Sequence, residues 1–256
     1  MDDLTPARTA EPPRAPLAVA SGRGSAWWTE GWHLFVAAPG PWVAITLIFI
    51  VLIVLIALIP IIGSVASSLL GPVFAGGIVA GCRSLDRGGG LTVGHLFAGF
   101  SDRLGPLIIV GLVYLIGSFA IVAVVAVCMI ATLGVGGITS LLSGDPYQAG
   151  MTLLASVGIG TLLALLVGSL LGIPLLMAYW FAPALVVLRN DEPLAAMKAS
   201  FVACLVNMLP MLVYSLLGLV FAIVASIPLG LGWFVLGPVF AASVYASYKD
   251  IFGAPA

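Results

Sequence analysis

The positions of the lysines and arginines constrain this chain more than any other feature. All nine lie between long apolar runs, and they occupy only every second gap between those runs. Cytoplasmic loops of membrane proteins are enriched in Lys and Arg, so the alternation predicts both the number of membrane spans and their orientation. The cations are Arg8, Arg14 and Arg23 before the first run, then Arg83, Arg87 and Arg103, then Arg189 and Lys198, and finally Lys249.

The composition argues against a water-soluble fold. Of the 256 residues, 62% are hydrophobic and only 7% are charged, whereas soluble domains carry roughly a quarter charged residues. A membrane span needs about 20 apolar residues. The first and last of the four stretches without Asp, Glu, Lys or Arg are long enough for two spans each, and the middle two for one each. These stretches are residues 31–82, 104–144, 146–188 and 199–248.

The predicted fold is therefore all-α, a polytopic bundle of six transmembrane helices. The charge pattern places both termini in the cytoplasm, with the bundle in a bacterial inner membrane. Residues 1–25 are rich in Pro, Ala and Arg and are predicted to be a disordered cytoplasmic tail, which leaves 26–256 as a single transmembrane domain. The expected spans are residues 42–59, 65–83, 106–133, one within 151–188, 209–227 and 229–248.

The middle of the chain leaves one alternative open. As a single helix, residues 151–188 would be about 57 Å long, which is nearly enough for two spans. The charge pattern favours one helix kinked near Pro174, because a second span would invert the C-terminal third of the chain. The preceding residues 134–150 are expected to form a polar, Gly-rich outer loop.

An internal repeat is visible in the sequence. The pentapeptide Gly-Pro-Val-Phe-Ala occurs at residues 71–75 and 237–241, and the twelfth residue after each glycine is a cation, Arg83 or Lys249. Each third of the chain also begins with a short amphipathic lead-in, followed by a proline suited to a first helical turn. We therefore predict three hairpins in parallel repeat, each with a short interfacial helix on the cytoplasmic side. The repeats are residues 31–87, 93–190 and 195–252.

Small residues recur every four positions in the fourth predicted span, which places them on one helix face. Small residues allow a second helix to approach closely, either within the bundle or from a second copy of the chain. Shorter versions of this pattern occur in the second and sixth predicted spans. The predicted packing residues are Ser156, Gly160, Ala164, Gly168 and Gly172, with Gly77 and Gly81, and Gly237 and Ala241.

No ionisable side chain lies at membrane depth in the predicted spans. Such groups mark proton relays and ion pathways, and intramembrane catalysis needs a convergent reactive set. We therefore expect no enzyme, no catalytic residue, no cofactor and no metal site. His33 and His95 occupy matching lead-in positions and are interpreted as polar edges of amphipathic helices. The net charge of −1 gives no electrostatic reason to expect nucleic acid as a partner.

Three stretches of the chain resemble an uncharacterised family of proteobacterial integral inner-membrane proteins: residues 95–100, 181–188 and 244–252. The resemblance would cover roughly residues 22–252 and implies an inner-membrane location without an assigned activity. More distantly, the lead-in and hairpin resemble the membrane domain attached to some glycerophosphodiester phosphodiesterases. That resemblance implies no activity here, because the sequence contains no catalytic phosphodiesterase domain.

Three functional hypotheses remain from the sequence. The first is a non-catalytic scaffold, assembly or lipid-organising protein, with membrane lipids and other membrane proteins or itself as partners. The second is a carrier or flippase-like protein for an apolar or lipid substrate. The third, a membrane enzyme, lacks a visible reactive set. A cavity lined by the second, fourth and sixth spans would favour the carrier, and Asn207 is the polar residue to examine for an inward-facing role.

Overall fold

The structure is a computed structural model that describes residues 15–60, 62–101 and 103–253. All regular structure within these ranges is helical, which confirms the all-α class. The elements are α1 (Arg23–Ala37), α2 (Pro39–Ala57), α3 (Ile62–Asp86), the 3₁₀ helix η1 (Val93–Phe100), α4 (Leu104–Leu142), α5 (Pro146–Trp180), α6 (Ala182–Leu188), α7 (Pro193–Val206), α8 (Met208–Ser226) and α9 (Trp233–Phe252).

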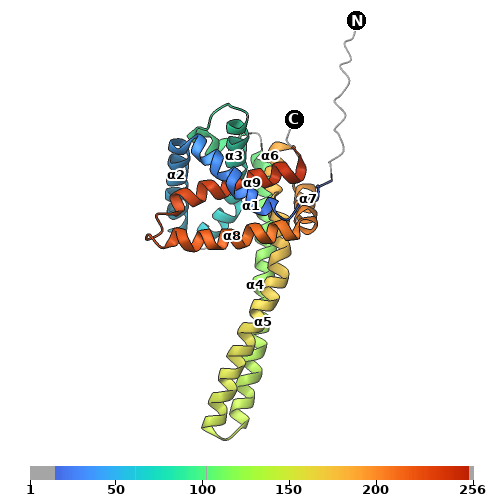
Figure 1. Cartoon of the computed structure of the whole chain (residues 1–256). Coiled ribbons are helices and arrows are strands. Elements are labelled where there is room, and N and C mark those ends of the chain that lie inside the picture. Colours follow the sequence, from blue (N-terminus) through green and yellow to red (C-terminus); the bar gives the residue numbers. More distant parts are fainter. Residues whose placement is uncertain (1–14, 61, 102, 254–256) are drawn as a thin grey trace.

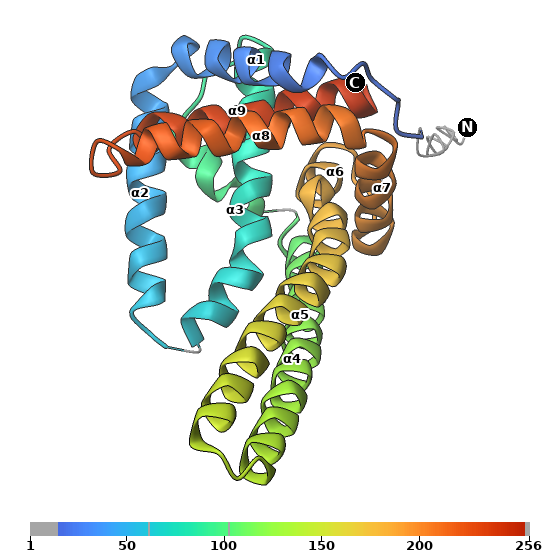
Figure 2. The same cartoon turned by 60° about the horizontal axis from the view of Figure 1, so that its bottom comes forward.

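Two directions dominate the arrangement of these helices. In Figure 1 the α4–α5 hairpin extends away from the rest of the molecule, whereas α8 and α9 run crosswise over one of its ends. Figure 2 shows the same relation after rotation about the horizontal, with α2 and α3 descending on the same side as the hairpin. Because α8 and α9 stay horizontal in both views, their steep angle to α4–α5 is a property of the fold and not of the viewpoint.

The order of the elements follows the predicted unit of lead-in and hairpin three times. A lead-in helix, namely α1, η1 or α7, precedes each of the hairpins α2–α3, α4–α5 and α8–α9. The hairpins differ in length and direction, however, so the structure does not confirm three equivalent repeats.

Among the described residues, five helical segments are long and apolar enough to cross a membrane: α2, α3, α4, α5 together with α6, and α8. The predicted sixth span corresponds to α9, which is not one of them. The structure therefore confirms several helices that can span a membrane, but it does not confirm six spans.

The α4–α5 hairpin is longer than predicted. Instead of ending near residue 133, α4 continues to Leu142, so the expected outer loop of residues 134–150 shrinks to a short turn that precedes Pro146. The reason is a close contact between the two helices: a Cβ on Gly136 would lie only 1.7 Å from Ser156 Oγ. Packing of α4 on α5 thus overrides the low helix propensity of the Gly-rich segment.

Residues 151–188 fall in one apolar segment that is divided into two helices, α5 and α6. Pro174 lies within α5, and the break comes at Phe181, between α5 and α6. Pro183 explains the position, since its ring would clash with the carbonyl of Tyr179 in a continuous helix. The backbone groups released there are satisfied by Ser200 of α7, whose Oγ accepts from Phe181 N (2.9 Å) and donates to Met177 O (2.6 Å).

The predicted tail is partly held against the helices. Residues 1–14 lie outside the described residues, but residues 15–20 run as extended chain before α1 begins. Asn207, at the junction of α7 and α8, accepts a hydrogen bond from Val19 N and donates to Leu17 O, both at 2.9 Å. Leu17 N donates in turn to Ile251 O of α9 (2.8 Å). We call residues 15–20 the N-terminal strap.

Helix α1 crosses both α8 and α9 at very short range. A Cβ on Gly24 would lie 2.2 Å from Pro210 O of α8, and a Cβ on Gly31 would lie 2.6 Å from Val239 O of α9. Between these points Trp28 stacks on Tyr214 with ring centroids 4.9 Å apart. The two glycines, seven residues apart and hence on one face of α1, set the distance between the lead-in helix and the last hairpin.

We predict that Gly31→Ala destabilises the protein by about 1–3 kcal/mol, because the added methyl group would meet backbone atoms of α9. The matched control is Gly40→Ala at the start of α2, where a Cβ meets nothing within 4 Å. That change is expected to be neutral or slightly stabilising. Thermal unfolding in detergent measures both variants, and equal melting temperatures for the two would contradict the close crossing of α1.

We predict that Asn207→Leu releases the N-terminal strap. The change leaves Val19 N and Leu17 O without their partners, at a cost of about 1–3 kcal/mol for each group that stays buried. Trypsin should then cleave after Arg23 faster than in the unchanged protein. Gln148→Leu, the same kind of change at an exposed position near the α4–α5 turn, serves as the control. Equal cleavage rates at Arg23 in both variants would refute this role of Asn207.

Candidate functional site

Neither histidine belongs to a group that could hold a metal, since the described residues contain no cluster of three or more His, Cys, Asp or Glu in a suitable arrangement. His33 is exposed on α1. His95 caps η1, with its Nδ1 accepting from Thr92 N (3.1 Å). The structure thus gives His95 a local structural partner within its own lead-in.

The predicted small-residue face of α5 lies against α4 of the same chain. A Cβ on Gly160 would meet Thr132 Oγ1 at 2.6 Å, and one on Gly168 would meet Val125 at 3.7 Å. Ser156 faces Gly136, whereas Ala164 is half-buried and a Cβ on Gly172 would meet nothing within 4 Å. The N-terminal part of this face, residues 156–168, therefore packs against α4 within the hairpin.

The shorter small-residue patterns contact other elements. A Cβ on Gly77 of α3 would lie 2.4 Å from His95 O, and one on Gly81 would lie 2.7 Å from Leu91. In α9, Gly237 approaches Thr46 of α2 more loosely, at 3.9 Å, and Ala241 packs against the main core. The small residues of α3 thus pack against η1 and the chain that precedes it, and Gly237 of α9 lies near α2. Helices α3 and α9 are the two that carry the repeated pentapeptide.

Charged side chains gather at the end of the molecule where α1, α3 and α9 meet. Asp86 of α3 accepts from Lys249 Nζ (2.8 Å) and from the Tyr245 hydroxyl (3.1 Å). Asp250 pairs with Arg23 and accepts from Trp27 Nε1 (2.7 Å). Both carboxylates thus tie α9 to other elements at their polar ends.

The α6–α7 connection belongs to the same polar end. Burial raises the pKa of the Asp191 carboxyl above its usual value, and the nearby Arg189 only partly opposes this effect. Their closest approach is 3.8 Å, and Arg189 also lies over the Phe252 ring. Asp191 therefore sits in a poorly solvated environment at the edge of the apolar body.

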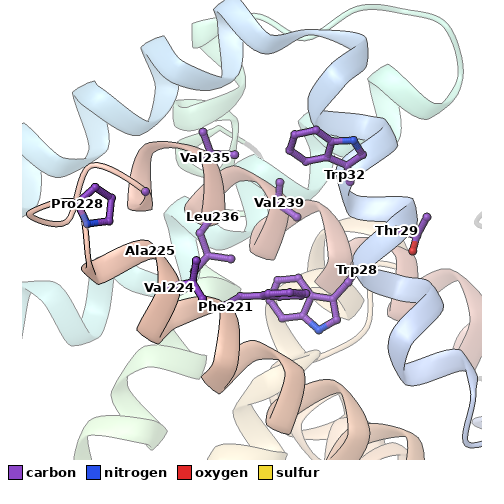
Figure 3. A pocket seen from close by; sticks show the side chains of 11 residues that line it. Trp28, Thr29, Trp32, Phe221, Val224, Ala225, Pro228, Val235, Leu236 and Val239 are labelled. Atoms are coloured by element: carbon purple, nitrogen blue, oxygen red, sulfur yellow. The ribbon is translucent and has the colours of Figure 1, made fainter.

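An open groove lies between α1 and the α8–α9 hairpin, and we call it the α1 groove. Its volume is about 560 Å³. Figure 3 shows Trp28 and Trp32 projecting from α1 towards the hairpin, with Phe221 and Leu236 on the other side. Thr29 is the one lining residue with a polar side-chain atom apart from the two indole nitrogens. The lining residues are Trp28, Thr29, Trp32, Phe221, Val224, Ala225, Pro228, Gly232, Val235, Leu236 and Val239.

A second groove of about 520 Å³ lies on the other side of α8, between α5 and α7, and is called the α7 groove. Three methionines line it, and their flexible thioethers adapt to irregular apolar ligands. The lining residues are Ile173, Leu176, Met177, Trp180, Cys204, Met208, Leu209, Met211, Leu212 and Ser215.

A smaller space of about 370 Å³, the central groove, lies beside both of these grooves. It shares Trp28 and Leu236 with the α1 groove, and Trp180 and Ser215 with the α7 groove. Trp180 makes an edge contact with the Phe240 ring at 5.9 Å, and its buried Nε1 has no acceptor among the described residues. The three grooves together surround α8 with apolar and aromatic walls.

The arrangement suits binding of an apolar molecule better than chemistry. None of the lining residues is charged, and burial raises the pKa of the Cys204 thiol to about 12, which disfavours its thiolate form. The sequence suggested a cavity between the second, fourth and sixth predicted spans as a sign of transport. The observed grooves instead lie around the fifth, α8, with α1 and α7 as walls. Sequence analysis missed them because they depend on how α1 crosses the last hairpin.

Comparison with known proteins places the chain in the membrane. It is 30% identical over 232 residues to a probable inner membrane protein of Burkholderia thailandensis, in an alignment that covers 90% of this chain and 83% of that protein. No protein-family model matches, so the resemblance to the phosphodiesterase membrane domain is not shown. No solved structure matches either. With this identity over most of both sequences, the chain belongs to the same family as this probable inner membrane protein.

Proposed function

We propose that this inner-membrane protein is non-catalytic and organises membrane lipids by holding their acyl chains in the grooves around α8. The observation that carries the proposal is the set of three neighbouring apolar grooves, which share wall residues and together line both sides of α8. A lipid tail in such a groove is held by van der Waals contacts with the apolar and aromatic walls, since the hydrophobic effect does not operate within the bilayer. Membrane lipids are thus the proposed partners.

The proposed orientation places the termini in the cytoplasm. The described cations Arg23, Arg83 and Lys249 lie at the polar end where α1, α3 and α9 meet, and cytoplasmic ends of membrane proteins are rich in such residues. At the opposite extreme, the α4–α5 turn carries Asp145, an acid, which caps α5 by accepting from Tyr147 N (2.9 Å). The grooves around α8 would then open towards the cytoplasmic leaflet.

The absence of catalysis is part of the proposal and rests on the chemistry of the grooves. Their hydroxyl groups come from Thr29, Tyr214 and Ser215, and the linings of the three grooves include no His, Asp or Glu beside them. A nucleophile needs such a base within hydrogen-bond reach. Binding and organisation of lipids require no such group.

We predict that Ser215→Trp reduces the lipid retained by the protein, because Ser215 lines both the α7 and the central groove. The indole takes the place of tail methylenes and removes their packing contacts with the groove walls, so the fraction of protein that retains lipid should fall severalfold. The measurement is native mass spectrometry of the protein after gentle extraction, with the number and kind of bound lipids as readout.

The control is Leu216→Trp, the neighbouring residue, which is 62% exposed and lines none of the three grooves. It adds the same ring to the same helix and should leave lipid retention unchanged. Equal retention in both variants would argue against the grooves as lipid sites. A stoichiometric protein partner in place of lipid would favour an assembly or scaffold role, and lipid transfer between leaflets of reconstituted vesicles would favour a carrier.

A further inference from the structure

The hydrogen bond between the N-terminal strap and α9 limits how the chain can cross the membrane. Leu17 N donates a hydrogen bond to Ile251 O (2.8 Å). These two residues, near opposite ends of the sequence, therefore lie on the same side of the membrane. The chain between them must therefore cross the bilayer an even number of times. Five helical segments of sufficient length and apolarity are found among the described residues, which is an odd number. Either α9 also crosses, which gives six spans, or α8 does not, which gives four.

The direction of the helices distinguishes these possibilities. The α4–α5 hairpin defines the membrane normal, because its helices of 39 and 35 residues are the longest and their apolar surface is exposed along most of their length. Helices α2 and α3 run along the same general direction in Figure 2, whereas α8 and α9 run across it in both views. A helix lying across the normal does not reach the opposite surface of the bilayer.

We infer that α8 and α9 form a hairpin that lies within the cytoplasmic leaflet, with α8 immersed among the acyl chains, so that the protein crosses the membrane four times. The spans are α2, α3, α4, and α5 with α6. This inference rests on the membrane location proposed above, and it does not depend on whether the grooves retain lipid.

The surface of the hairpin fits acyl chains as its occupant. Helix α8 is apolar on all sides, and its outer residues are widely exposed in the protein, with Leu212 at 63% and Leu216 at 62%. The turn to α9 is more exposed still, with Ile227 at 75% and Leu229 at 97%. Only a hydrocarbon environment removes this area from water, and the helical backbone leaves few polar groups unpaired there.

The polar residues that flank the hairpin fit a leaflet boundary. The far end of α9 carries Lys249 and Asp250, which pair with Asp86 and Arg23 outside the apolar body. Helix α1 lies over α8 and α9, with Arg23 and Glu30 joined by an ion pair on its surface. In Figure 1, α8 lies on the side of α9 that is nearer the free length of α4–α5. The headgroups would thus meet α1 and α9, and the tails would meet α8.

The test uses reciprocal reporters inserted into the full chain between Gly230 and Leu231. Alkaline phosphatase is active only in the periplasm, and green fluorescent protein folds only in the cytoplasm. We expect an inactive phosphatase and a fluorescent protein at this site. Insertion after Gly144 at the α4–α5 turn is the periplasmic control, and insertion after Asp191 is the cytoplasmic control. An active phosphatase with a dark fluorescent protein in the α8–α9 turn would establish six spans and overturn the inference.

A second measurement covers the case in which the insertions prevent accumulation of the protein. Leu229→Cys is placed in a background in which Cys82, Cys128 and Cys204 are replaced by alanine, and membrane vesicles are treated with an impermeant maleimide. The inference predicts no labelling of this cysteine in right-side-out vesicles, where Ser143→Cys at the α4–α5 turn serves as the labelled control. Labelling of Leu229→Cys in right-side-out vesicles would refute it. Loss of lipid retention with this topology intact would refute only the proposed function.

Discussion

The close crossing of α1 over α8 and α9 is the contact on which the rest of this structure depends. At Gly24 and Gly31 the backbones of three helices come within van der Waals distance, so no side chain separates them. This proximity brings Trp28 onto Tyr214, and the Tyr214 hydroxyl onto Ser243 of α9 (2.7 Å). In lipid, where helices gain little from hydrophobic association, such packing is the main source of adhesion between them. On the α1 side, the α1 groove is lined by Trp28, Thr29 and Trp32, which lie between or beside these contact points.

Breaks in the helices impose a second constraint, since every released backbone group needs a partner where water is scarce. The protein meets this requirement with single polar side chains. Ser200 satisfies both backbone groups at the α5–α6 break, and Asn207 bonds to Ala203 O as well as to the N-terminal strap. Both side chains are fully buried. One residue therefore serves two purposes in each case, because it ends a helix and also fixes a neighbouring segment.

The sequence predicted the helical class and the membrane location, since these follow from charge placement and apolar length, whereas six spans and three equivalent hairpins are not confirmed. It placed the end of α4 too early, because Gly136 looks like a loop residue until Ser156 of α5 is known to lie against it. It placed the break in the middle of the chain at Pro174 instead of Phe181, where Ser200 from another helix provides the compensating bonds. Gly24 was not recognised because nothing near it in the sequence reveals Pro210. The grooves were missed for the same reason, as their walls come from segments far apart in the chain.

The long hairpin and the crosswise helices pose opposite requirements for a bilayer. At 1.5 Å per residue, α4 is about 58 Å long, roughly twice the thickness of the hydrocarbon core. Its outer part therefore needs a tilt or lies beyond the core, which fits the polar turn at Ser143 and Asp145. Helix α8 has the length of one span, about 28 Å, but runs across the hairpin. If the bilayer normal is parallel to the α4–α5 hairpin, α8 lies in the plane of the bilayer. Helix α8 would then displace or bind the surrounding acyl chains. Grooves on both sides of α8 are what such tails would fill, so the proposed topology and the proposed lipid-organising role draw on the same geometry.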